Sequence, residues 1–212
     1  MSTMPGASRW RSTAMTWNSA ESGLYGQIAS IVLSLAVLLA VLSIVYASWR
    51  NGISPMPASA KMRRAAAEQI NRMGGNGLIV EAGSGWGTLA LHLASHCAGW
   101  RIVGIENAVV PLAGSRLLGW LTLRALPRPK TALRSAASFL RGDLYDYPYE
   151  GADVVVCYLY PGAMKRLSGI FRERLKPGAR IVSLCFALPG WQPEREVVCR
   201  DAYRTKIYVY TV

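Results

Sequence analysis

The longest apolar stretch of the chain extends from residue 22 to residue 49. It contains 28 residues and no charged side chain, whereas a helix needs only about 20 apolar residues to cross the hydrocarbon layer of a bilayer. Aromatic residues, which favour the headgroup region, mark both ends: Trp17 and Tyr25 on one side, Tyr46 and Trp49 on the other. A core helix would normally show a polar face, and the apolar part of a cleaved signal peptide is shorter. The pattern therefore predicts one transmembrane helix over residues 22–49.

Beyond residue 60, short apolar runs alternate with segments of helical periodicity. The predicted strands are 78–82, 101–106, 137–141, 153–160 and 179–186, and the predicted helices are 61–73, 87–97, 110–126 and 162–175. Such alternation is typical of an α/β domain with a mostly parallel sheet covered by helices. The last two segments, EVVCRD and RTKIYVYTV, alternate β-branched and aromatic residues and predict a closing hairpin.

These patterns divide the chain into four parts. We expect an N-terminal leader over residues 1–21, the transmembrane helix over 22–49, a linker over 50–60, and one soluble domain over 61–212. The linker assignment rests on two prolines and several small residues.

Basic residues set the predicted orientation. The net charge is +12 and the isoelectric point is about 10.0, which indicates an anionic neighbour. Four basic residues follow the apolar helix closely: Arg50, Lys61, Arg63 and Arg64. Only Arg9 and Arg11 precede it, offset by Glu21. The positive-inside rule then places the domain on the cytoplasmic side. A bacterial inner membrane is favoured over a mitochondrial one, although the leader also has features of an organelle transit sequence.

A second basic region lies between Glu106 and Asp143, where the sequence has six basic residues and no acidic one. It could be a solvated face, a surface that faces anionic lipid, or an RNA-binding surface. We favour lipid, and nucleic acid is disfavoured because no nucleic-acid-binding module is recognisable.

Metal chemistry is not indicated. The four cysteines are far apart and form no CxxC pair, so neither a zinc site nor a disulfide framework is predicted. His92 and His96 are four residues apart on one helix face, but no third ligand accompanies them.

A glycine-rich turn, GSGWG, connects the strand 78–82 to the next helix. Gly83, Gly85 and Gly87 would let the backbone approach a ligand at the carboxyl edge of the sheet. A dinucleotide fingerprint would need glycine at position 88, where the chain has Thr88, and the lysine of a Walker loop is absent.

With Glu81 two residues before the first glycine, the turn resembles the E/D-x-G-x-G-x-G motif of class I S-adenosylmethionine-dependent methyltransferases. That resemblance implies a Rossmann-like fold with a seven-stranded sheet and S-adenosyl-L-methionine as the cofactor. Glu106, at the end of the second strand, would take the ribose hydroxyls, and Asp143 would lie at the adenine. The cofactor-binding residues expected on this basis are Glu81, Gly83, Ser84, Gly85, Gly87, Glu106, Asn107, Asp143, Leu144 and Tyr158.

Later segments resemble a narrower group, the membrane-anchored protein lysine methyltransferases that modify the adenine nucleotide translocase and the ATP synthase c subunit, with their prokaryotic relatives. The shared features are Pro111, Ser115 and Arg116 after Glu106, the GDL triplet 142–144, and Phe186, Pro189 and Trp191 in the segment 179–193. The chain departs from that group at Trp86 and Thr88. The resemblance implies that Tyr160 and Pro161 border the methyl-transfer channel and that Trp191 lies on the acceptor side; these three are the candidate catalytic residues.

Three hypotheses about function follow. The first is a membrane-anchored methyltransferase that modifies a lysine of a protein at or near the membrane. A second keeps the chemistry but takes a lipid, quinone or other hydrophobic small molecule as the acceptor. In the third, the domain is a non-catalytic cofactor-binding module. Trp86 could stack on the cofactor or pack in the fold, and Tyr145, Tyr147 and Tyr149 could line a pocket or fill a loop.

Overall fold

The computed structural model of the chain describes residues 9–51, 56–125 and 137–212. It divides into two compact units, an N-terminal one that ends at Ser43 and a larger one from Ile44 to Val212. The first helix, α1, covers Arg9–Asn51. Its segment Leu24–Tyr46 has a mean hydropathy of 2.9, and none of its most apolar part is buried. By length and composition this segment could cross a membrane, as the sequence predicted.

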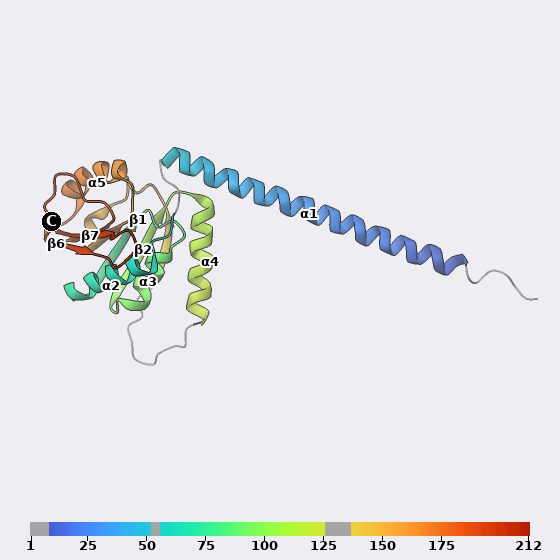
Figure 1. Ribbon diagram of the computed structural model, residues 1–212, viewed down its shortest axis with the longest axis horizontal. Coiled ribbons are helices and arrows are strands. Elements are labelled where there is room, and N and C mark those ends of the chain that lie inside the picture. The colour runs from blue at the N-terminus through green and yellow to red at the C-terminus, as the bar shows by residue number, and fades with distance from the viewer. Residues whose placement is uncertain (1–8, 52–55, 126–136) are drawn as a thin grey trace, which may run out of the picture. The chain divides into compact units, whose positions relative to one another are not determined.

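The second unit is a three-layer α/β domain (Figure 1). Its seven strands form a single sheet in the order β3-β2-β1-β4-β5-β7-β6. The strands are β1 Gly77–Ala82, β2 Trp100–Glu106, β3 Ala137–Arg141, β4 Val154–Cys157, β5 Arg180–Leu184, β6 Arg195–Val198 and β7 Lys206–Thr211. β1 to β5 pair in parallel, while β7 is antiparallel to both β5 and β6. This mostly parallel, Rossmann-like sheet and its closing hairpin confirm the predicted fold class.

Helices cover both faces of the sheet, with α2 and α3 on one face and α5 on the other (Figure 1). Their bounds are α2 Ala60–Met73, α3 Thr88–His96, α4 Val109–Ala125 and α5 Pro161–Arg174, with a 3₁₀ helix at Tyr149–Gly151. All four α-helices lie within a residue or two of the predicted positions. α2 begins directly after Ser59, whose Oγ accepts a hydrogen bond of 3.2 Å from the Met62 N–H.

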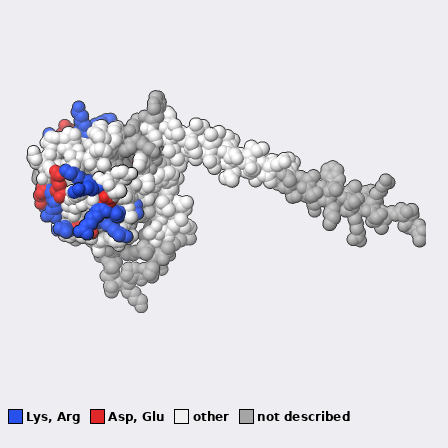
Figure 2. Space-filling model, viewed as in Figure 1, with Lys and Arg blue, Asp and Glu red and all other residues white. Residues whose placement is uncertain are grey.

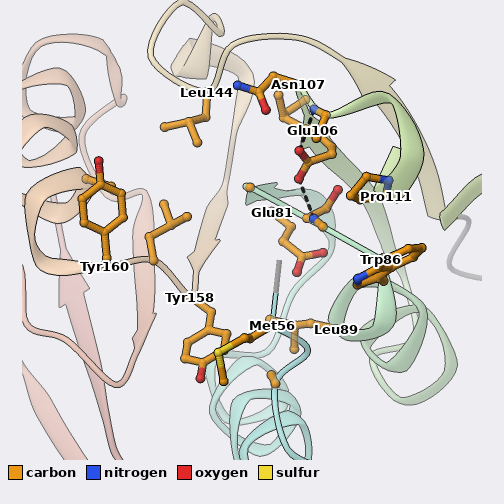
Figure 3. A pocket seen from close by; sticks show the side chains of 18 of the residues that line it. Met56, Glu81, Trp86, Leu89, Glu106, Asn107, Pro111, Leu144, Tyr158 and Tyr160 are labelled. Carbon is orange, nitrogen blue, oxygen red and sulfur yellow. Dashed lines mark hydrogen bonds between the residues drawn. The ribbon is translucent and has the colours of Figure 1, made fainter. Parts of the chain in front are cut away.

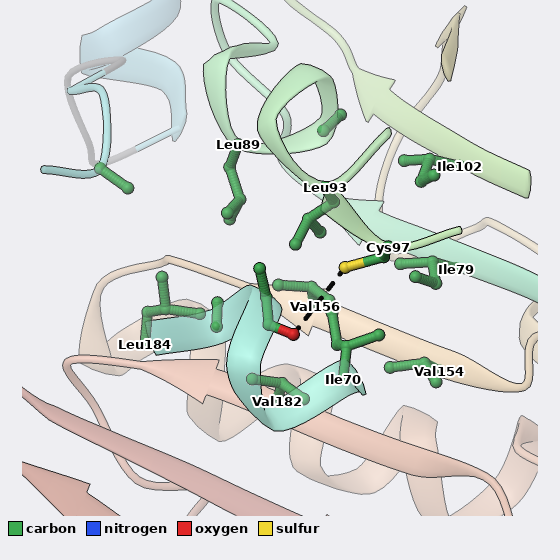
Figure 4. Packing of buried hydrophobic residues seen from close by; sticks show 14 of the residues in the cluster. Ile70, Ile79, Leu89, Leu93, Cys97, Ile102, Val154, Val156, Val182 and Leu184 are labelled. Carbon is green, nitrogen blue, oxygen red and sulfur yellow. Dashed lines mark hydrogen bonds between the residues drawn. The ribbon is translucent and has the colours of Figure 1, made fainter. Parts of the chain in front are cut away.

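Two apolar clusters form the core, one on each face of the sheet. Ile70, Ile79, Leu93, Ile102 and Val156 belong to the cluster under α2 and α3 (Figure 4). On the opposite face, alternate strand residues such as Val80 and Val155 pack against α5 and Tyr149. Buried strands of this kind show continuous apolar runs in the sequence because both faces are covered.

Two strands are shorter than the sequence predicted. β4 ends at Cys157, so Tyr158 and Tyr160 leave the ladder instead of continuing it. β5 ends at Leu184, because Cys185 turns the chain with a φ of 76°. The apolar and aromatic character of both segments continues past the true strand ends, which is why periodicity overestimated their length.

Gly87 provides a test of packing at the start of α3. Its φ is 73°, and a Cβ atom placed on it would lie 2.6 Å from Phe139 and 2.7 Å from Ser115. Gly87→Ala should therefore lower the free energy of unfolding by about 1–3 kcal/mol. Chemical denaturation of the purified full chain would measure the loss. The control is Gly169→Ala, since Gly169 lies within α5 with open space around it; an equal loss in both variants would contradict the argument.

Candidate functional site

A pocket opens at the carboxyl edge of the sheet, where β1 lies between β2 and β4 and the strand order reverses. Ligands of α/β sheets bind at such a point. The segments after strands β1 to β5 contribute residues to it (Figure 3). The lining residues from these loops include Gly83, Ser84, Gly85, Trp86, Glu106, Asn107, Ala108, Gly142, Asp143, Leu144, Tyr145, Tyr158, Leu159 and Tyr160.

The glycine loop after β1 has all three predicted glycines in the left-handed region, with φ values of 75°, 52° and 73° at Gly83, Gly85 and Gly87. A side chain at Gly83 would collide with Leu159, 2.7 Å from its Cβ position. Gly83 and Gly85 line the pocket, as predicted, but Gly87 does not. Gly87, expected to approach the ligand like the other two glycines, instead packs against Phe139 and Ser115.

Glu106 connects two of the loops. Its Oε2 accepts a hydrogen bond from the Gly85 N–H at 2.8 Å, and its Oε1 accepts one from the Ala108 N–H, also at 2.8 Å (Figure 3). Each carboxylate oxygen can accept a second hydrogen bond. Glu106 therefore orders the loop and keeps acceptor capacity for ligand hydroxyls.

Glu81, at the end of β1, lies on the floor of the same pocket and is only 4% exposed. Burial raises the pKa of Glu81 from 4.5 to about 8, the hydrogen bond from the Ala90 N–H at 3.0 Å opposes this rise, and the charge of Glu106 adds to it. With Asp143, three acidic side chains thus share one pocket. A ligand with positive charge would favour the ionised form of Glu81 and relieve the repulsion between them.

Aromatic side chains form another wall of the pocket, with Tyr145, Tyr158, Tyr160 and Phe186 in its lining. The Arg166 guanidinium lies 3.8 Å from the centroid of the Tyr145 ring. Burial raises the pKa of Tyr145 to about 12, and the neighbouring Tyr160 hydroxyl adds to the rise. The Tyr145 phenol is consequently neutral at physiological pH.

The three tyrosines of the loop after β3 have different surroundings. Tyr145 lines the pocket, whereas Tyr149 is fully buried and donates a hydrogen bond of 2.7 Å to the Leu144 carbonyl. Tyr147 packs edge-on against Tyr149. Trp86 both lines the pocket and packs on α4, because a Cβ at Gly114 would lie 2.6 Å from its ring.

Two of the three candidate catalytic residues are absent from the pocket lining formed by the described residues. Tyr160 lines the pocket. Pro161, the first residue of α5, and Trp191 are not among the lining residues. The Trp191 indole N–H donates to Ser168, 3.0 Å from its Oγ, and the ring contacts Tyr210. The predicted roles of Pro161 at the methyl-transfer channel and of Trp191 on the acceptor side remain predictions.

Sequence reasoning missed Arg166 as a pocket residue. It lies on α5, one and a half turns after Tyr160, and no motif marks it. The helical spacing from the end of β4 is the signal that could have placed it near the sheet edge. His92 and His96, weighed earlier as a pair, stack on each other with ring centroids 3.9 Å apart.

Residues 81–195 match the family model described as the ANTKMT methyltransferase domain. The chain belongs to this family. The match begins at Glu81, includes the glycine loop and Glu106, and extends beyond β5. Most residues that line the pocket therefore belong to a methyltransferase domain.

Two curated relatives have names that refer to lysine methylation. The adenine nucleotide translocase lysine N-methyltransferase of Mus musculus is 30% identical over 135 residues, which are 61% of this chain and 54% of the relative. A protein-lysine N-methyltransferase of Saccharolobus islandicus is 27% identical over 84 residues, 39% of this chain and 52% of the relative. The chain thus spans about half the length of the curated relatives it matches.

Solved structures show the same fold. An RNA methyltransferase from Salinibacter ruber, in complex with S-adenosyl-L-homocysteine, is 26% identical with a TM-score of 0.62 and covers 74% of this chain and 94% of its own. The precorrin-6y C5,15-methyltransferase of Geobacter metallireducens is 14% identical with a TM-score of 0.54, over 73% of this chain and 89% of its own. The second likeness concerns the fold alone.

The raised pKa of Glu81 predicts a pH effect on stability. As pH rises from 4.5 towards 8, the unfolded chain loses this proton while the native state keeps it, so the free energy of unfolding falls. Glu81→Gln removes the effect. The free energy of unfolding of the variant minus that of the unmodified protein should therefore increase by about 1.4 kcal/mol for each pH unit within this window. Denaturant unfolding of both proteins at several pH values measures the difference, and parallel pH profiles would contradict it.

Proposed function

We propose that the protein is a membrane-anchored, S-adenosylmethionine-dependent protein-lysine N-methyltransferase that acts on a protein at or near the membrane. The match of residues 81–195 to the ANTKMT methyltransferase domain carries this proposal. The acidic, aromatic-walled pocket at the sheet edge supplies the chemistry.

The pocket suits this cofactor by its charge. S-adenosylmethionine carries a sulfonium and an ammonium group but no phosphate, and the pocket offers acidic side chains, Glu81 and Glu106 among them, together with the close backbone of Gly83 and Gly85. Glu106 would accept hydrogen bonds from the ribose hydroxyls. The other residues that would hold the cofactor are Ser84, Asn107, Asp143, Leu144 and Tyr158. Bound there, the cofactor supplies an activated methyl group.

On the acceptor side, the residues that line the pocket affect whether an incoming amine is protonated. A lysine must lose its proton, to solvent or to a base, before it can attack a methyl carbon, and the described part of the pocket lining contains no histidine. The Arg166 guanidinium and the aromatic surface of Tyr145 and Tyr160 both lower the pKa of an approaching ammonium group, by repulsion and by desolvation. The phenolic oxygens can then accept a hydrogen bond from the neutral amine and orient its lone pair.

Membrane attachment is supported by α1 and by charge. The segment Leu24–Tyr46 is long and apolar enough to span a bilayer, and the basic residues after it favour a cytoplasmic location for the domain. One curated relative is named for the adenine nucleotide translocase as its substrate. We infer an acceptor of similar class, a lysine on a protein in or beside the membrane.

Glu106→Gln tests the cofactor site. The amide keeps the shape of the side chain but can accept from only one of the two backbone N–H groups and loses the charge. The dissociation constant for S-adenosylmethionine should rise about 10–100-fold, measured by isothermal titration calorimetry. The matched control, Glu150→Gln, changes an exposed acid outside the pocket and should leave affinity unchanged. Equal affinities for all three proteins would refute the assignment of Glu106.

The acceptor can be identified with radiolabelled S-adenosylmethionine. Purified full-length protein is incubated with membranes from cells that lack its gene, and products are separated into protein and lipid fractions. We expect label in a discrete protein band, mapped to lysine by mass spectrometry, and strongly reduced label with Glu106→Gln. Label found only in the lipid fraction would show that the acceptor is a hydrophobic small molecule and not a lysine. Cofactor binding with no label in either fraction would refute the enzymatic proposal.

A further inference from the structure

Helix α4 presents an apolar outer face. Its residues are Val109, Ala113, Leu117, Trp120 and Leu121, which repeat at helical spacing along one side. Leu117 is 58% exposed, and Val109, Trp120 and Leu121 are each about half exposed. The surface over α4 is largely uncharged in the view of Figure 2. We call these five residues the outer face of α4.

The inner face of the same helix is already occupied. Leu112, Ser115 and Gly119 are buried, and a Cβ at Gly119 would lie 3.4 Å from Phe139 of β3. The helix is therefore apolar on both sides, whereas a helix at the surface of a soluble domain normally has a polar outer side. Such an outer face is typical of a helix that has a further partner.

The charge of the sequence segment that contains α4 indicates what that partner is. From Asn107 to Gly142 the sequence contains six basic residues and no acidic one. Arg116, on α4 itself, is held by hydrogen bonds of 3.2 and 3.1 Å from its Nε and an Nη to the Phe139 carbonyl. Leucines and a tryptophan beside basic residues are the composition of helices that lie in the interface of an anionic bilayer.

The length of the chain between the candidate span and the domain also supports a bilayer as the partner. Eleven residues lie between Tyr46, the last residue of the candidate span, and Ala58, which is buried in the domain core. A chain of that length reaches at most about 40 Å. If α1 spans a bilayer, the domain and its α4 stay close to that bilayer's surface.

We infer that the outer face of α4 lies in the headgroup region of an anionic bilayer, as a second membrane contact besides α1. This inference rests on the membrane anchorage of the proposed function. It also has a consequence for the substrate. Ala108 and Pro111, at the beginning of α4, line the pocket, so the methyl-transfer site would open close to the lipid headgroups. An acceptor lysine would then lie at the membrane surface rather than far out in solvent.

Lipid photolabelling tests the contact directly. The full-length protein is reconstituted into vesicles of phosphatidylcholine and phosphatidylglycerol that contain a diazirine-bearing phospholipid, and labelled residues are mapped by mass spectrometry. We expect label in Leu24–Tyr46 and also on the outer face of α4. The triple variant Leu117→Gln, Trp120→Gln, Leu121→Gln should reduce α4 label at least about fivefold. Val198→Gln, which changes a similarly exposed apolar residue on β6, should leave it unchanged.

The outcomes separate this inference from the proposed function. Label in Leu24–Tyr46 but none on α4 would overturn the α4 contact and leave the anchor intact. Cross-links between the α4 helices of two chains, without lipid label there, would show a second copy as the partner and would also overturn it. Label in neither segment would refute membrane anchorage as well. Affinity for S-adenosylmethionine, measured in parallel, should be the same in the triple variant and the unmodified protein, which shows that the domain is folded.

Discussion

A single side chain, Glu106, determines how the two central loops of the site are held. One of its oxygens accepts the Gly85 N–H and the other accepts the Ala108 N–H, so the turn after β1 and the turn after β2 share one carboxylate. Ser84 adds a backbone link between the same regions through its N–H, which donates to the Ile105 carbonyl at 2.8 Å. The pocket is therefore preorganised by the fold. A preformed site of this kind lowers the entropic cost of binding.

Glycine is needed at the three positions of the motif for different physical reasons. Gly83 and Gly85 keep the backbone close to the pocket, while Gly87 makes room for Phe139 and Ser115 where α3, α4 and β3 meet. The glycines of the motif therefore serve two purposes, the approach of the backbone to a ligand and the packing of α3 and α4. Substitution of any of the three would affect the site, but the change at Gly87 would act through the position of α3 and α4 rather than through contact with a ligand.

Periodicity in the sequence was sufficient to predict the helices and the order of the elements, but it placed the ends of β4 and β5 too late. The resemblance to the methyltransferase motif and family pointed to Glu81, Glu106 and Tyr160, which lie at one edge because the carboxyl ends of parallel strands meet there. Sequence reasoning could not place Trp191, since the partner of its indole N–H is Ser168 on a different element. Nor could it find Arg166, whose place over the Tyr145 ring depends on side-chain direction across two elements. The span of α1 and its orientation remain predictions from composition.

The sheet has an order of assembly built into its topology. β7 is the last of the seven strands in the sequence, yet it lies between β5 and β6 and pairs with both. Until β7 has been synthesised, β5 presents an open edge and β6 has no partner in the sheet. Open strand edges favour aggregation. By that time the apolar segment of α1 has long left the ribosome. The growing chain could thus be delivered to a bilayer before its domain closes, which would keep the incomplete sheet away from other nascent chains.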